Sequence, residues 1–119
     1  MKKILVVDDD RDVLEGLQIM LQQEGYDTRI ASEGDEAYYE ARKVHPDLII
    51  MDYLLSGTNG CILAQKLKGS ADTRQIPILM ISAHPDADKR SYEYGIDDFM
   101  AKPFEIDYFL SMIRRYTAN

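Results

Sequence analysis

Three short stretches of this chain are apolar at every position: LVV at residues 5–7, LIIM at 48–51 and ILMI at 78–81. A strand that is apolar on both sides must be buried on both faces of its sheet, which is typical of parallel strands covered by helices. None of these runs approaches the roughly 20 apolar residues that cross a bilayer. The stretches therefore predict the inner strands of a parallel sheet and no membrane span.

The order of the predicted elements indicates the same fold class. Short β-branched segments alternate with segments whose apolar residues recur at helical spacing. The predicted strands are residues 3–8, 27–31, 48–52, 78–81 and 98–101. The predicted apolar helix faces are Val13/Leu17/Met20/Leu21, Ala37/Ala41/Val44, Leu63/Ala64/Leu67 and Ile106/Phe109/Leu110/Ile113, and a less apolar helix is expected over 85–94. Such alternation predicts an α/β domain with right-handed crossovers and helices on both faces.

Length and charge limit the classes of function. A chain of 119 residues with 45% hydrophobic content is long enough for one domain, so we expect residues 1–119 to form a single unit. The net charge of -7 would repel a phosphate backbone, so direct binding of nucleic acid is not expected. The start of the chain leads into a predicted strand and not a signal sequence, which favours a cytoplasmic protein. Cys61, the only cysteine, is expected to be a small buried residue.

Polar side chains follow the predicted strands at the points where they end. Ligands of open α/β sheets bind outside the carboxyl ends of the strands, near the point where strand order reverses. In chain order, the residues at those ends are Asp8, Asp9 and Asp10, then Asp52, then Ser82 and Ala83, then Lys102. The apolar strands thus deliver acids, a hydroxyl and a base to one rim.

The run of three aspartates needs an explanation beyond helix capping. One of them, or Asp12, can cap the first helix by accepting backbone N–H bonds, but one cap needs only one acid. If the first and third strands are adjacent, about 4.8 Å apart, the acids come within reach of Asp52 and repel it. A divalent cation would remove that repulsion, and an oxygen-only ligand set favours magnesium.

An incomplete protein shell around magnesium points to a phosphoryl ligand, because this ion usually combines one or two carboxylates with phosphate oxygens. Lys102 would supply a second positive charge. The hydroxyl of Ser82 and the backbone N–H of Ala83 can donate to a phosphoryl oxygen. One carboxylate is then free to act as the nucleophile that forms an acyl phosphate, and Asp52 is the candidate.

Four motifs in this order resemble one family. ILVVDDD, DLIIMDYLL, PILMISAH and GIDDFMAKPF are together similar to the receiver domain of two-component response regulators, over essentially the whole chain. The resemblance implies the fold of the chemotaxis response regulator. This is a flavodoxin-like, doubly wound, five-stranded parallel sheet of order 2-1-3-4-5 with five helices on both faces.

The resemblance also implies roles for individual residues in metal binding. Asp9 corresponds to a direct Mg²⁺ ligand and Asp8 to a largely water-mediated one. Asp52 corresponds to the phosphoacceptor, which also ligates the metal, and the backbone carbonyl of Leu54 to a further ligand. Mn²⁺ is the expected substitute for Mg²⁺.

Further roles concern the response to phosphorylation. Ser82 corresponds to the hydroxyl that contacts the phosphoryl group and moves on activation, and Lys102 to the invariant lysine. Pro103 corresponds to a proline that often follows that lysine through a cis peptide bond. Phe99 lies at the position of the switch aromatic, which turns inward when the hydroxyl shifts.

The activity implied is that of a phosphoacceptor signalling domain and not of an enzyme with a separate substrate. A sensor histidine kinase or a histidine phosphotransfer protein would donate the phosphoryl group. The domain would catalyse only its own phosphorylation and dephosphorylation, and would switch the surface of the fourth helix, fifth strand and fifth helix. Output would pass to a separate target protein or to an effector domain beyond these residues.

The chain departs from the family pattern after the phosphoacceptor. Leu55-Ser56 replaces the usual Met-Pro pair and Asn59-Gly60 replaces Asp-Gly. Loss of the proline should loosen the loop, while Asn59 can still cap the next helix. Leu54 is apolar where relatives often carry a polar side chain that orients water, so we expect a long-lived phosphoryl group.

Three other functions fit these residues less well. A degenerate receiver that serves as a docking module would lack an acid, the hydroxyl or the lysine, and none is missing. The Asp8-x-Asp10 spacing is similar to the nucleophile motif of haloacid-dehalogenase-type phosphohydrolases. That match fails because Asp12 replaces a Thr or Val and Asp97-Asp98 begins a strand instead of ending one. A Rossmann nucleotide site is weaker still, since no Gly-rich turn follows the first strand.

Overall fold

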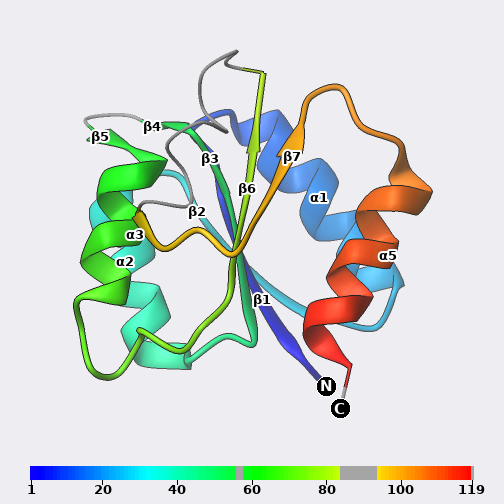
Figure 1. Ribbon diagram of the computed structural model, residues 1–119. Helices are drawn as coiled ribbons and strands as arrows, with labels where there is room; N and C mark the ends of the chain where they lie inside the picture. The colour runs from blue at the N-terminus through cyan, green and yellow to red at the C-terminus, as the bar shows by residue number, and fades with distance from the viewer. Residues whose placement is uncertain (56–57, 84–93, 119) are drawn as a thin grey trace.

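Five parallel strands form the sheet at the centre of the molecule (Figure 1). The computed structural model describes residues 1–55, 58–83 and 94–118. The strand order is β2-β1-β3-β6-β7, which confirms the predicted order 2-1-3-4-5. The strands are β1 (Lys3–Val7), β2 (Asp27–Ala31), β3 (Leu48–Asp52), β6 (Ile78–Ser82) and β7 (Asp98–Ala101).

Helices cover both faces of the sheet, as predicted. Helices α2 and α3 lie on one side and α1 and α5 on the other (Figure 1). The four helices among the described residues are α1 (Arg11–Gln23), α2 (Gly34–Val44), α3 (Gly60–Lys68) and α5 (Ile106–Thr117). None of the described helices has the length and apolar character needed to cross a membrane. Residues 85–93 of the helix predicted over 85–94 fall outside the described residues.

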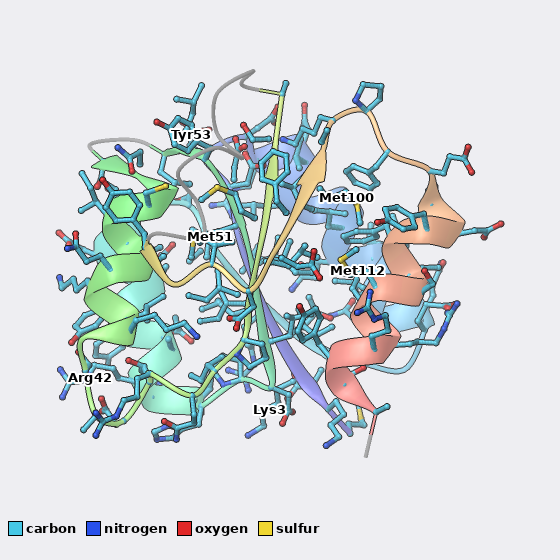
Figure 2. All side chains as sticks on the ribbon, viewed as in Figure 1. Lys3, Arg42, Met51, Tyr53, Met100 and Met112 are labelled. Carbon is cyan, nitrogen blue, oxygen red and sulfur yellow. The ribbon has the colours of Figure 1, made fainter. Side chains whose placement is uncertain are left out.

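Two apolar clusters, one on each face, follow from the alternation of side chains along each strand. Leu5 and Met51 belong to the cluster under α2 and α3, whereas Ile4 and Ile50 belong to the cluster under α1 and α5. Figure 2 shows Met51 on the α2/α3 side of the sheet and Met112 on the opposite side. Burial of the inner strands on both faces explains why they are apolar at every position.

The positions that face the core in two helices differ from the prediction. In α1 the buried residues are Leu14 and Leu21, while Val13 is only half-buried. The centre of the buried stripe therefore passes through Leu14. In α5 Met112 is buried and Ile106 is 54% exposed. Because helical side chains lean towards the N-terminus, that of Ile106, the first residue of the helix, projects past its end.

Candidate functional site

Three carboxylates meet at the carboxyl edge of the central strands. Asp8 directly follows β1 and Asp52 ends β3, and these two strands are hydrogen-bonded neighbours. Asp8, Asp9 and Asp52 each offer one oxygen, and the three oxygens lie within 4.8 Å of one another. Strands β1 and β3 are therefore adjacent, an arrangement that the sequence left open, and the three carboxylates lie close together.

Asp10 has a separate role from its two neighbours. Its Oδ1 accepts hydrogen bonds from the backbone N–H groups of Asp12 (3.0 Å) and Val13 (3.4 Å), so it caps α1. Its own N–H donates to Oδ1 of Asp8 at 2.9 Å, which helps to orient that carboxylate. The run of three acids thus divides into one cap and two members of the cluster.

Lys102, which follows the edge strand β7, brings a positive charge to the cluster. Its Nζ lies 3.5 Å from Oδ2 of Asp8 and 3.7 Å from Oδ1 of Asp52. The backbone N–H of Lys102 donates to the carbonyl of Ser82 at 3.0 Å, which ties the residues after β7 to the end of β6. The Lys102–Pro103 peptide bond is cis, the isomer that the resemblance implies.

The electrostatics of Asp52 favour a cation. Burial raises the pKa of Asp52 above its ordinary value, and the charges of Asp8 and Asp9 raise it further. Lys102 and the hydrogen bond from the N–H of Tyr53 act in the opposite direction, and that bond is 2.9 Å long. One ammonium group only partly neutralises three acids. A hard divalent cation fits this all-oxygen donor set and would complete the neutralisation.

The remaining predicted site residues lie around this centre. Ser82 is buried at the end of β6, and Ala83, directly after it, is exposed. Phe99 is half-buried on β7 and packs against the apolar cluster under α2 and α3. Leu54 is 56% exposed in the short strand that follows Asp52.

A small hairpin follows the phosphoacceptor candidate and was not predicted. Strands β4 (Leu54–Leu55) and β5 (Thr58–Asn59) pair antiparallel, and residues 56–57 between them, which include the Ser56 departure, lie outside the described residues. As predicted, Asn59 caps α3, because its Oδ1 accepts the N–H of Ile62 at 3.0 Å. The hairpin and the cap fix the path of the chain from the site into α3.

Sequence reasoning gave no role to Gly60, the first residue of α3. A Cβ at this position would lie 2.6 Å from the backbone oxygen of Asp52 and 2.7 Å from Cε of Met80. The N–H of Gly60 also donates to the carbonyl of Tyr53 at 2.6 Å. The helix can approach the strand end that carries Asp52 only because this residue has no side chain. A glycine at the first position of a predicted helix was the available signal.

Known proteins are similar to this chain in sequence and fold. A family model described as the response regulator receiver domain matches residues 4–114. The DNA-binding response regulator MtrA of Mycobacterium tuberculosis is 35% identical over 115 residues, which cover 95% of this chain and 49% of that protein. The chain therefore spans about half the length of such relatives.

Solved structures show the same fold over nearly the whole chain. A putative response regulator from Chloroflexus aurantiacus is 35% identical, with a TM-score of 0.90 over 99% of this chain and 98% of that one. The signal receiver domain of a histidine kinase from Syntrophus aciditrophicus is also 35% identical, with a TM-score of 0.89 over 98% of this chain and 89% of that one.

Proposed function

Because the chain belongs to the family of response regulator receiver domains, we propose that it accepts a phosphoryl group on Asp52 in a magnesium-dependent reaction. Receiver domains are signalling domains, so the phosphohydrolase alternative has no support. The observation that carries the proposal is the position of Lys102, whose Nζ lies within 4 Å of both Asp8 and Asp52. The aspartates, Lys102 and the hydroxyl of Ser82 all lie at the carboxyl edge of the sheet.

The arrangement supplies what transfer to a carboxylate requires. A carboxylate oxygen of Asp52 attacks phosphorus of a phosphohistidine, the P–N bond breaks, and its electron pair stays on the imidazole nitrogen. Lys102, the hydroxyl of Ser82 and the N–H of Ala83 stabilise the negative oxygens of the transferred group.

Mg²⁺, held by Asp8, Asp9, Asp52 and the carbonyl of Leu54, would neutralise charge on phosphate and carboxylates. Mn²⁺ should substitute.

Phosphorylation would then act as a switch. It adds about 1.5 to 2 negative charges beside the existing acids. The new oxygens attract Ser82 and Lys102, and Phe99 moves into the space that Ser82 leaves. Because Phe99 lies on β7, the change reaches the surface of β7 and α5, shifting an equilibrium between two conformations. The fourth helix of this surface is expected at 85–94, of which residues 85–93 lie outside the described residues.

The partners follow from this chemistry. The phosphodonor is a sensor histidine kinase or a histidine phosphotransfer protein. MtrA is named a DNA-binding response regulator and is about twice as long as this chain. Output here would pass to an effector domain of that kind or to a separate target, while residues 1–119, a single domain with net charge -7, would not bind nucleic acid themselves. We place the protein in the cytoplasm.

The test is phosphorylation by a small donor. Wild type, Asp52→Asn and Asp10→Asn are incubated with acetyl phosphate and Mg²⁺, and intact mass is measured. Asp10→Asn is the matched control, because asparagine caps a helix as well as aspartate does. Wild type and Asp10→Asn should gain one acid-stable, base-labile phosphoryl group, and Asp52→Asn none. Failure of the folded wild type to gain it would favour the docking-module alternative instead.

A further inference from the structure

Lys102 reaches the site from the residues after β7, a strand at the edge of the sheet. Asp8 follows β1 and Asp52 ends β3, and both of these strands have hydrogen-bonded neighbours on both sides. Strand β7 lies at the edge and pairs only with β6 among the strands that the structure describes. An element with fewer partners opens and shifts more readily. Phosphoryl transfer is sensitive to small displacements of the groups involved, so Lys102 needs support from elsewhere.

Part of that support comes from α3. Oδ2 of Asp97, directly before β7, accepts hydrogen bonds from Nζ of Lys68 (3.1 Å) and from the N–H of Ile78 (2.8 Å). The same ammonium group donates to the carbonyls of Ile76 (2.8 Å) and Arg74 (3.2 Å). Lys68 therefore binds α3 to the residues that lead into both β6 and β7.

A second contact comes from α5, on the opposite face of the sheet (Figure 1). The hydroxyl of Tyr116 donates to Oδ2 of Asp98 at 2.9 Å and lies 3.4 Å from the carbonyl of Asp97. Oδ1 of Asp98 accepts the N–H of Phe99 at 3.2 Å. The pKa of Tyr116 is raised to about 12, mainly by burial and next by the hydrogen bond to Asp98. The hydroxyl is therefore protonated at neutral pH and can donate.

We propose that Lys68 and Tyr116, acting through Asp97 and Asp98, are positioning residues for Lys102 in phosphoryl transfer. We call these four residues the β7 clamp. They hold the amino end of the edge strand from both faces of the sheet, which restricts the strand that delivers Lys102. The proposal rests on the proposed function. The proposed metal ligands lie after β1, at the end of β3 and on β4, so metal binding should not depend on the clamp, whereas the rate of phosphoryl transfer should.

The chain offers a close control for each contact. Tyr116→Phe removes one hydroxyl and keeps the ring, and Lys68→Met removes the ammonium group and keeps most of the stem. Tyr26→Phe removes a hydroxyl that bonds Oγ1 of Thr117 at 3.0 Å, on the same helix as Tyr116. Lys66→Met removes a lysine from α3 that lies 3.8 Å from Asp35. Among the described residues, neither Tyr26 nor Lys66 makes a side-chain hydrogen bond or an ion pair with the clamp.

The experiment compares rates of labelling by acetyl phosphate with Mg²⁺ affinities from calorimetry. Each clamp variant should be phosphorylated severalfold more slowly, and the double variant about tenfold more slowly. Mg²⁺ affinity should match wild type, and both controls should match it in rate and affinity. Lys68→Arg, which keeps the charge, should restore most of the rate. Amide hydrogen exchange at Phe99 and Lys102 should be faster in the clamp variants alone.

Two results would overturn the proposal. Unchanged labelling rates in folded Tyr116→Phe, together with unchanged exchange at Phe99, would show that the contact does not position β7. Equal losses of rate and Mg²⁺ affinity would indicate general loosening of the domain.

If Lys68→Met does not fold, Tyr116→Phe still tests the proposal. If wild type itself is not labelled, the proposed function fails, and hydrogen exchange still reports whether the clamp holds β7.

Discussion

Replacement of the Asp52 carboxylate by an amide should stabilise the metal-free protein. Oxygens of Asp8, Asp9 and Asp52 lie within 4.8 Å of one another, and two unit charges at that separation repel by about 1 kcal/mol in water and about 3.5 kcal/mol at an effective dielectric constant of about 20. Lys102, at 3.7 Å from Asp52, offsets part of this repulsion. We expect Asp52→Asn to raise the free energy of unfolding by about 1 kcal/mol at neutral pH.

The pH dependence has a definite sign. Because the pKa of Asp52 is raised by burial above its ordinary 3.8, the folded state binds this proton more tightly than the unfolded state. Wild type therefore loses stability as the pH rises from 3.8 through the raised folded value, since the unfolded state then holds fewer protons than the folded state. The advantage of Asp52→Asn should appear above this interval and vanish below pH 3.8.

Magnesium should reverse the order of the two proteins. A ligand at 100 times its dissociation constant adds about 2.7 kcal/mol of stability, which for a domain of this size raises Tm by about 10 °C. Asp52→Asn should lose most of that gain.

The assay is urea unfolding followed by circular dichroism, between pH 3 and 8, with and without Mg²⁺. Asp35→Asn, a change of the same charge at a fully exposed residue, is the control. Equal stabilisation of Asp52→Asn and wild type by Mg²⁺ would show that the Asp52 carboxylate does not help to hold the metal.

Substitutions at three further positions test the segment after Asp52. Leu54→Asn should raise the autodephosphorylation rate about tenfold by orienting a water molecule, and a rate equal to or below wild type would count against this role. Gly60→Ala should cost about 1 to 3 kcal/mol in urea unfolding and slow phosphorylation, because its Cβ would displace the backbone of Asp52. Asn59→Ala should cost about 1 kcal/mol whereas Asn59→Asp should cost little; equal losses would show that the cap does not matter.

The fold could be predicted because its signals are local and repeated. Strands that are apolar at every position, such as residues 48–51, required helices on both faces, and two apolar clusters are present. The face of each helix that packs on the sheet was less predictable. The stripe of α1 is centred on Leu14, because the direction in which a helix crosses the sheet decides which of several apolar neighbours is deepest.

The convergence of the acids could also be predicted, because the carboxyl ends of parallel strands share one edge. The support around them could not. Lys68 has the sequence environment of an ordinary exposed helical lysine, and its contacts with Ile76 and Asp97 depend on a loop that the sequence does not place. Strands β4 and β5 have two residues each, too short to show a period of two.

We propose above that Asp9, Asp52 and Lys102 form one site for a metal ion and a phosphoryl group. The most direct test is a crystal structure of the chain grown with Mg²⁺ and trifluoroberyllate, a phosphoryl mimic. We predict beryllium bonded to a carboxylate oxygen of Asp52, Mg²⁺ contacting Asp9 and Asp52, and Nζ of Lys102 within hydrogen-bonding distance of a fluorine. Mimic and metal bound apart from each other, or Lys102 directed away from both, would contradict the claim.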